Sequence, residues 1–395
     1  MEKKDKNLNV PNLRFPEFSG EWEKCTLGDI TTNFSLRNKE QIQYPMYSVT
    51  NNRGFVPQSE QFEDREMMGE DIKAYKIIHE GDFAYNPARI NVGSIAKYSK
   101  KDPCMISSLY VCFKAHSNID KEWMMQLLKT PKMNFYYNVN GEGGVRVYLF
   151  YPNFARIRTS YPSLVEQQKI AAFLKLLDQR IETQRKVIEK YESLIRGLIT
   201  YLNNGKIGQC KTVCLRELLT ECHEKNSDNH EVCSVSVSHG VINQVDYLGR
   251  SFAAKEVLHY NVVNYGDIVY TKSPTGEFPY GIVKRSNLDR PVAVSPLYGV
   301  YRPVNDYVGI YLHLYFKSPV NTKNYLNRLI QKGAKNTINI TNQHFLDNKI
   351  LIPENGWLEI IVNSASTIEK MIQIECNALL CLERQKNYLL SKMFI

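Results

Sequence analysis

The chain contains the same pattern of residues twice, in the same order. A Gly-Asp pair inside a Tyr-bounded stretch at 75–85 returns at 260–270, so that Gly81-Asp82 corresponds to Gly266-Asp267, 185 residues later. A Pro, Ser, Leu-Tyr pattern at 103–110 returns at 291–298, and Lys-Thr-Pro at 129–131 returns as Lys-Ser-Pro 188 residues later. Solenoid repeats are only about 20–50 residues long. The sequence therefore predicts a duplicated domain.

Length and charge allow a nucleic-acid partner. A chain of 395 residues predicts two or three domains, and each half is long enough to bury its own core. Lys and Arg exceed Asp and Glu by 50 to 41, a net charge of +9, which fits a polyanion although many proteins without such a partner reach it. No apolar run approaches the roughly 18 residues of a membrane span, and the charged N-terminus has no signal-peptide pattern. We expect no membrane contact and a cytoplasmic location.

The nine cysteines indicate thiols and not a metal site. Cys210, Cys214, Cys222 with His223, and Cys233 form a loose cluster, but a structural zinc site would have two close pairs of ligands. Reduced thiols are the better interpretation. We predict no bound metal.

Each half predicts a mixed domain of short strands followed by a helix. The strand segments are short, rich in β-branched or aromatic residues and bounded by Gly, Pro or Asn. In the first half they are 43–49, 73–78, 82–85, 95–98 and 109–114, with a helix at 121–129. In the second half they are 232–237, 261–263, 267–271, 282–284 and 297–301, with a helix at 323–331.

Each half also ends in a long amphipathic helix. Ser163 with Glu166 has the spacing of a capping box, and a heptad pattern runs from there to about residue 202. A second pattern occupies 356–395. The apolar seams are Ile170, Leu174, Leu177, Ile181, Ile188, Tyr191 and Ile195 in the first helix, and Ile368, Ile372, Leu379, Leu382 and Leu389 in the second. The helices could each pack on their own domain or mediate dimerisation, but the duplication favours an antiparallel pair within the chain.

Motifs of catalysis are absent from the sequence. No Gly-rich nucleotide loop follows a strand, and His223-Glu224 lacks the second His of a zinc-protease motif because Ser227 stands there. Asn86-Pro87-Ala88-Arg89 lacks the second Pro and the aromatic residue of an adenine methyltransferase motif. These absences predict a protein that binds and has no catalytic site.

Two segments resemble a known family. Pro11-Asn-Leu-Arg-Phe-Pro-Glu-Phe-Ser-Gly-Glu-Trp22, and Pro162-Ser-Leu-Val-Glu-Gln-Gln-Lys-Ile170 at the start of a long helix, resemble the specificity subunits of type I restriction-modification systems, the HsdS family. The Gly-Asp turns resemble a recurrent turn of its target recognition domains. Gly356-Trp357-Leu358-Glu359-Ile360 keeps only part of the helix signature in the second half.

The resemblance implies an α+β fold. Two similar target recognition domains would be joined by two long antiparallel coiled-coil helices in a pseudo-twofold duplication. The boundaries expected are an arm at 1–21, recognition domains at 22–162 and 205–355, and helices at 163–204 and 356–395.

The resemblance also implies partners. The chain would bind double-stranded DNA with a bipartite, asymmetric sequence and dock two modification subunits and the restriction subunits with their translocase activity. The modification subunits bring S-adenosylmethionine and methylate adenine N6, and the restriction subunits use ATP with Mg²⁺. The chain itself would bind no cofactor. The alternative is a paired-domain scaffold that assembles proteins and does not recognise DNA.

Polar loops supply the candidate DNA contacts. Lys and Arg provide phosphate contacts, and Arg, Lys, Asn and Gln pair with base edges. The candidates are Asn86, Arg89, Asn91, Lys97 and Arg146 in the first half, and Thr271, Lys272, Ser273, Thr275, Lys284, Lys332, Lys335 and Asn336 in the second.

Overall fold

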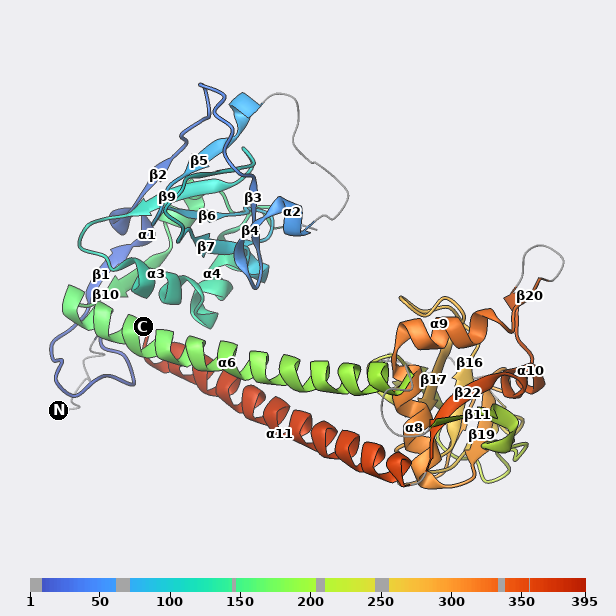
Figure 1. The fold of residues 1–395 in the computed structure, drawn as a ribbon. Helices are drawn as coiled ribbons and strands as arrows, with labels where there is room; N and C mark the ends of the chain where they lie inside the picture. Colours follow the sequence, from blue (N-terminus) through green and yellow to red (C-terminus); the bar gives the residue numbers. More distant parts are fainter. Residues whose placement is uncertain are drawn as a thin grey trace, which may run out of the picture. The chain divides into compact units, whose positions relative to one another are not determined.

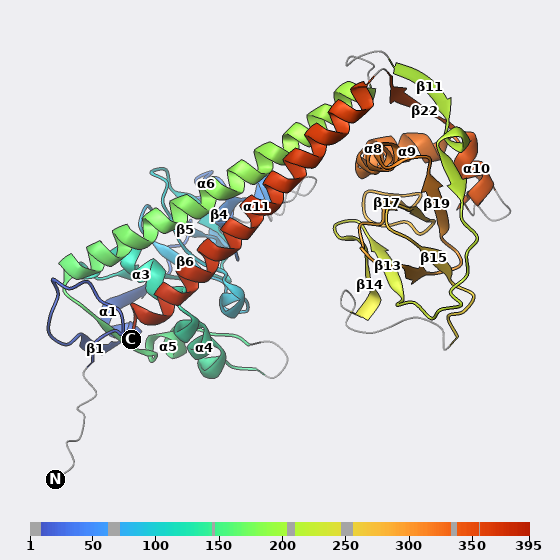
Figure 2. The same ribbon diagram turned by 90° about the horizontal axis from the view of Figure 1, so that it is seen from below.

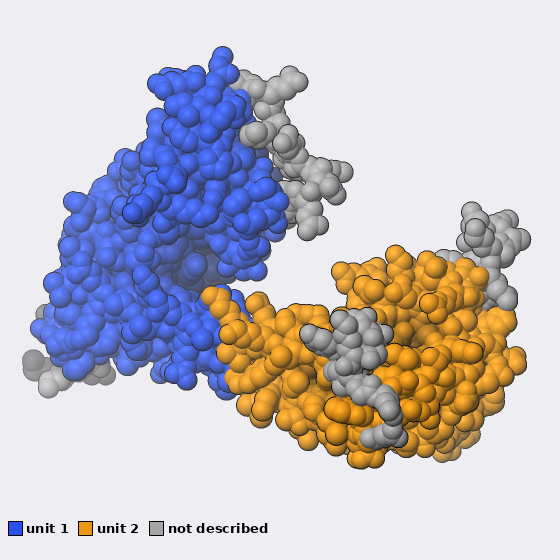
Figure 3. Space-filling view, viewed as in Figure 1, with its two compact units in different colours: residues 1–185, 377–395 blue, residues 186–376 orange. Residues whose placement is uncertain are grey.

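A computed structural model describes residues 9–61, 72–143, 147–203, 210–245, 256–332, 338–354 and 356–395. Contacts divide the chain into two compact units, coloured separately in Figure 3. Unit 1 comprises 1–185 and 377–395, and unit 2 comprises 186–376. No helix in the described part of the chain is both long and apolar enough to cross a membrane.

Unit 1 is built on a four-stranded antiparallel sheet with the order β2-β9-β6-β7. These strands are β2 (Thr31–Phe34), β9 (Val111–Ala115), β6 (Phe83–Tyr85) and β7 (Ile95–Lys97). Three two-stranded ribbons accompany the sheet. They are β1 (Glu23–Thr26) with β10 (Arg158–Tyr161), β3 (Tyr47–Thr50) with β4 (Gly54–Pro57), and β5 (Lys76–Ile78) with β8 (Cys104–Ile106).

The two faces of this sheet are covered differently. The aromatic face, with Phe83, Tyr85 and Phe113, packs with helical side chains such as Phe154 in the largest core. The opposite face places Ala84 and Ala96 against the β3–β4 ribbon. The short helices are α1 (Leu27–Ile30), α2 (Gln58–Gln61), α3 (Lys121–Leu128), α4 (Pro131–Asn140) and α5 (Tyr151–Ala155), with 3-10 turns η1 (Ile72–Ala74) and η2 (Ile90–Val92).

Unit 2 repeats the four-stranded sheet and the three ribbons of this plan (Figures 1 and 2). Its sheet has the order β12-β19-β16-β17, formed by β12 (Leu219–Glu221), β19 (Gly299–Pro303), β16 (Ile268–Thr271) and β17 (Ile282–Arg285). Its ribbons are β11 (Cys210–Cys214) with β22 (Lys349–Pro353), β13 (Cys233–Ser236) with β14 (Gly240–Asn243), and β15 (Asn261–Val263) with β18 (Val292–Val294). Its further elements are η3 (Leu215–Glu217), α8 (Asp306–Lys317), α9 (Pro319–Asn327), α10 (Asn342–Asp347), β20 (Gln331–Lys332) and β21 (Ile338–Asn339).

The repeated Gly-Asp pair has a structural role in both units. Gly81 and Gly266 adopt φ of 86° and 88°, a left-handed conformation that favours glycine. Asp82 is buried and accepts the backbone N–H of His79 at 3.0 Å. Asp267 is also buried and accepts the backbone N–H of Asn264 at 2.8 Å. The pair therefore fixes the turn that leads into β6 and β16.

Two long helices, α6 (Leu164–Asn203) and α11 (Trp357–Lys392), take part in both units. In unit 1, Leu174 near the start of α6 shares a core with Leu389 near the end of α11. In unit 2, Ile195 near the end of α6 shares a core with Ala365 near the start of α11. The helices therefore run antiparallel within each unit. The predicted α+β fold with an internal duplication and paired helices is confirmed.

Several helices, among them α4 and α8, were not predicted from the sequence, and another was misplaced. The prediction places a helix at 323–331, but α9 ends at Asn327 and residues 331–332 form β20. Helix α8, immediately before it, was not predicted, because its Val, Ile, Tyr and Phe residues are typical of strands. Val308, Tyr311 and Phe316 are buried and the helix packs against β17 and β19, so it has little of the polar face that makes a helical period visible.

Candidate nucleic-acid interface

In unit 1, three of the predicted contact residues, Asn86, Arg89 and Asn91, lie on the loop between β6 and β7. Its shape is set by Asn86, whose backbone N–H donates to Ser94 O at 3.0 Å and whose side-chain oxygen accepts the backbone N–H of Ala88 at 3.0 Å. The loop is tied to the segment after α4, because Leu149 N–H donates to Pro87 O at 3.0 Å. Two polar loops are thus held next to each other.

The polar side chains on and near this loop differ in whether they already have a partner within the chain. Asn91 donates to Asn138 of α4 at 2.9 Å. Lys97 lies at the far end of β7 and forms an ion pair with Glu122 of α3, and its side chain is 15% exposed. Arg89 is exposed, and its guanidinium has no hydrogen bond or ion pair among the described residues. Of these three, Arg89 is the side chain available to an external anion.

In unit 2, the equivalent loop joins β16 to β17. Thr275 and Phe278 exchange two backbone hydrogen bonds, each of 3.0 Å, which close a tight turn. The hydroxyl of Tyr280 donates to Asn327 of α9 at 3.3 Å, so this loop also contacts the helix that precedes the second polar loop. Lys272 and Ser273 are exposed, whereas Thr271 is buried in β16.

Several predicted contact residues lie elsewhere. Lys284 is buried in β17, beyond the loop, with 4% of its surface exposed. Lys332 lies in β20, and its side chain is outside the described part of the structure. Arg146, Lys335 and Asn336 fall outside the described residues.

Three exposed cations beside these loops were overlooked in the sequence. Lys132 is at the start of α4, and Lys323 and Arg328 lie on or just after α9. Both helices follow a Thr-Pro or Ser-Pro start that is repeated in the two halves, so this repeat was the signal that could have located them. Lys132 therefore adds a positive charge beside the loops of unit 1, and Lys323 and Arg328 add two beside the loops of unit 2.

The two sequence motifs at 11–22 and 162–170 contact each other at the start of α6 in unit 1. Glu166 is almost completely buried and accepts two hydrogen bonds from Arg14, at 2.8 and 2.7 Å, and one from Trp22 at 3.3 Å. Gln167 accepts the backbone N–H of Asp120, the N-cap of α3, at 2.8 Å and donates to Pro162 O at 2.9 Å. These residues join the N-terminal segment, α3 and α6.

The residues of the predicted helix seams on α6 and α11 differ in how deeply they are buried. Fully buried members are Ile170, Leu174, Ile181, Ile195 and Leu389, and partly buried members are Leu177, Ile188, Tyr191, Ile368, Ile372, Leu379 and Leu382. Other apolar side chains face solvent. On α6 they are Leu164, Val165, Phe173, Leu176 and Leu194, and on α11 they are Trp357, Ile360, Met371, Ile374, Leu380 and Tyr388.

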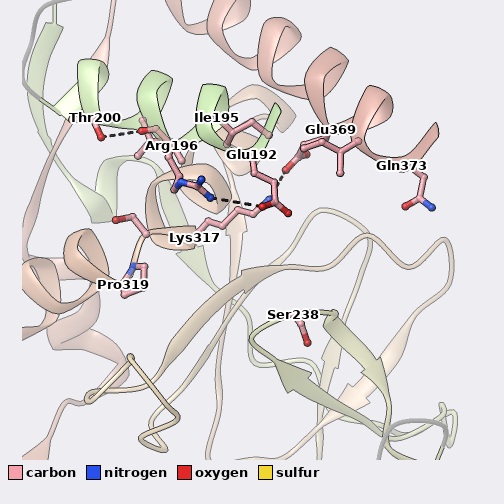
Figure 4. A pocket seen from close by; sticks show the side chains of 12 residues that line it. Glu192, Ile195, Arg196, Thr200, Ser238, Lys317, Pro319, Glu369 and Gln373 are labelled. Atoms are coloured by element: carbon pink, nitrogen blue, oxygen red, sulfur yellow. Dashed lines mark hydrogen bonds and ion pairs between the residues drawn. The ribbon is translucent and has the colours of Figure 1, made fainter. Parts of the chain in front are cut away.

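A hollow in unit 2 has a volume of about 640 Å³ (Figure 4). Its floor is apolar, with Ile195, Ile199 and Ile372, and its rim is charged. Lys317 is paired with Glu369 at 3.0 Å, so the rim charges are partly neutralised within the chain. Among the described residues, no group of three His, Cys, Asp or Glu side chains could hold a metal ion. The described lining of this hollow forms no catalytic constellation.

A family model decides the assignment. The model described as "Type I restriction modification DNA specificity domain" matches residues 19–192, which cover the first sheet domain and most of α6. Residues 19–192 therefore form a domain of the type I restriction-modification DNA specificity family. The prediction made from the N-terminal and helix motifs is confirmed.

Solved structures match the fold of this chain over nearly its whole length. The S subunit of a type I restriction-modification system from M. genitalium matches with a TM-score of 0.57 at 11% identity, covering 98% of this chain and 99% of that one. A second structure, from work on complex assembly and conformational transition of the type I R-M system, matches with a TM-score of 0.56 at 13% identity, covering 94% and 97%. At these identities the likeness establishes the fold alone. No curated protein matches the sequence.

Proposed function

We propose that this chain is the sequence-specificity subunit of a type I restriction-modification complex, and that each recognition domain binds one half of a bipartite, asymmetric DNA target. The observation that supports this most is the pair of equivalent loops. The β6–β7 and β16–β17 loops occupy the same place in two duplicated sheets, yet the residues after the shared tyrosine are Asn86-Pro-Ala-Arg89 in unit 1 and Thr271-Lys-Ser-Pro274 in unit 2. Different side chains on one scaffold are what the recognition of two different half-sites requires.

The chain would contribute specificity and no catalysis. We propose domain boundaries at 22–162 and 205–355, with two modification subunits docked beside the helices and restriction subunits joining the larger complex. The exposed apolar residues of α6 and α11 support such docking, because Val165, Leu176 and Ile374 are each about two-thirds exposed. S-adenosylmethionine, and ATP with Mg²⁺, would be bound by those partners.

The loop cations test DNA binding directly. Replacing Arg89 or Lys272 by Ala should lower the DNA affinity of the assembled complex. Each variant should also reduce the slope of log K against log salt by about one for every phosphate that the cation neutralises. A cost of about 1–3 kcal/mol confined to particular target sequences would instead indicate a base contact. The measurement is DNA binding across a series of salt concentrations.

Matched controls are available on the ribbon strands. Lys24 in β1 and Lys349 in β22 are exposed lysines away from the two loops, so their Ala variants should leave both the affinity and the salt slope unchanged. If the loop variants behave like these controls, the loops do not contact DNA.

We further propose that the paired helices set the distance between the two half-sites. Asp178 of α6 forms an ion pair with Lys386 of α11, so seven residues inserted after Leu177 and seven after Lys386 would lengthen both helices at one level. At 1.5 Å per residue the insertion adds about 10 Å, which corresponds to roughly three base pairs. The methylated motif should then have a longer unspecified spacer. A folded variant that methylates the original motif would rule out this role.

A further inference from the structure

A second cavity in unit 2 is lined by basic side chains. It has a volume of about 250 Å³ and lies between the turn of the β13–β14 ribbon, the end of β17 and the last turns of α8. Its charged and titratable lining residues are Lys284, Arg285, His239, His313 and Lys317, and the described lining includes no carboxylate. Ser238 and Lys317 also line the larger hollow of Figure 4.

Most of these cations already have partners. Arg285 donates to Asn287, is paired with Asp306 and lies over the ring of Tyr265 at 4.6 Å. Lys317 is paired with Glu369, as Figure 4 shows. The positive charge of these two residues is therefore largely balanced within the chain.

Lys284 is the exception. It is 96% buried, and its ammonium makes no hydrogen bond or ion pair with any described residue. Burial and the nearby Lys317 lower the pKa of Lys284 to about 8, while Glu369 opposes the shift, so the group is still mostly protonated at pH 7. A buried and unpaired ammonium is costly unless an anion accompanies it.

His313 adds a neutral donor beside Lys284. Burial and the neighbouring cations lower the pKa of His313 to about 3, so the ring is uncharged at neutral pH. Its Nδ1 accepts the backbone N–H of Arg285 at 3.3 Å, which places the ring proton on Nε2. A neutral N–H and two ammonium groups therefore line the same cavity.

The equivalent place in unit 1 is apolar and closely packed. Ala84 and Val269 are equivalent in the two sheets, and their cross-strand partners are Ala96 and Lys284. Ala96 belongs to an apolar core, and a Cβ placed on Gly54 of the covering ribbon would lie 3.3 Å from its Cβ. In unit 2, a Cβ on the matching Gly240 would meet nothing closer than 4.0 Å. Lys284 therefore replaces an alanine at a position where the covering ribbon of unit 2 packs less closely than that of unit 1.

We propose that this cavity binds one phosphate group, held by Lys284 with Lys317 and His313. A tetrahedral oxyanion can accept hydrogen bonds from several directions at once. It could therefore accept from all three of these donors, which come from β17 and α8. The volume exceeds the roughly 30 Å³ of one water molecule many times, yet is below the range of about 300–1,000 Å³ typical of larger ligands. The phosphate could be free inorganic phosphate or, if the proposed function holds, a backbone phosphate of bound DNA.

The first experiment titrates the isolated full-length chain with inorganic phosphate and needs no DNA. We expect saturable binding by calorimetry, and a loss of roughly 10- to 100-fold in affinity for Lys284→Met, which keeps the side-chain volume and removes the charge. His313→Gln should weaken binding less. Lys370→Ala, on the exposed side of α11, is the control and should bind as the original chain does.

The source of the phosphate is tested in the assembled complex. If the cavity takes a DNA phosphate, Lys284→Met should reduce the salt slope of DNA binding by about one, and inorganic phosphate should compete with DNA. An unchanged slope together with saturable phosphate binding would assign the cavity to a free anion. Equal phosphate affinity for the original chain and Lys284→Met, or no saturable binding by either, would overturn the proposal without bearing on DNA recognition by the loops.

Discussion

Replacing Glu166 by Ala should destabilise unit 1 by about 3 kcal/mol or more. The carboxylate is 2% exposed and accepts both Arg14 and Trp22, so its removal leaves a guanidinium and an indole N–H without their acceptor. The N-terminal segment would also lose its main connection to α6. The measurement is the denaturant midpoint followed by tryptophan fluorescence, because Trp22 and Trp123 are both buried in the unit 1 core.

Glu359 provides the matched control for this experiment. It occupies the first turn of α11, as Glu166 does in α6, but it is exposed and has no ion pair among the described residues. Glu359→Ala should therefore change stability by no more than about 0.5 kcal/mol. Glu166→Gln, which keeps the acceptor oxygen, should fall between the two. Equal midpoints for Glu166→Ala and Glu359→Ala would mean that the buried cluster does not stabilise the unit.

The second large effect is expected at Gly281, where the β16–β17 loop enters β17. Its φ is +99°, and a Cβ at this position would lie 1.9 Å from the carbonyl oxygen of Thr271. Gly281→Ala therefore combines backbone strain with a clash against backbone, and should cost about 3 kcal/mol or more. Faster hydrogen exchange of the β16 and β17 amides would report the disrupted hairpin. Under the proposed function, one half of the methylated motif should lose its sequence preference.

Gly276 in the same loop serves as the control. Its φ is +53°, and a Cβ there would meet nothing within 4 Å, so Gly276→Ala should cost only about 1–2 kcal/mol. Both variants replace a glycine of the same loop by alanine, but only Gly281→Ala places the new Cβ against a backbone atom. Similar exchange rates in both would show that the hairpin accommodates a side chain at Gly281, contrary to the geometry.

The sequence predicted the features that repeat or have a clear period. The duplication located the Gly81 and Gly266 turns and the strands after them, because a left-handed glycine followed by a turn-capping Asp has a specific sequence signature. The heptad seams located α6 and α11. Helix α8 was missed because burial on several sides replaces its polar face with strand-forming residues.

The candidate interface was less accessible from the sequence. Residue type located the loops, but Asn86 and Asn91 hydrogen-bond to Ala88 and Asn138 of the chain itself, which no local pattern reveals. Lys284 illustrates the same difficulty. An isolated lysine in a strand is expected to be exposed, and only the fold places it in a cavity with no ion-pair partner among the described residues.

The most direct test of the central claim is the adenine methylation pattern of a genome in cells that express this chain with its modification subunit. The proposed function predicts a bipartite motif, methylated on both strands and absent from cells without this chain. The Arg89→Ala variant should relax or remove one half of that motif and leave the other intact. A soluble complex that produces no methylation dependent on this chain would contradict the claim that the chain recognises DNA.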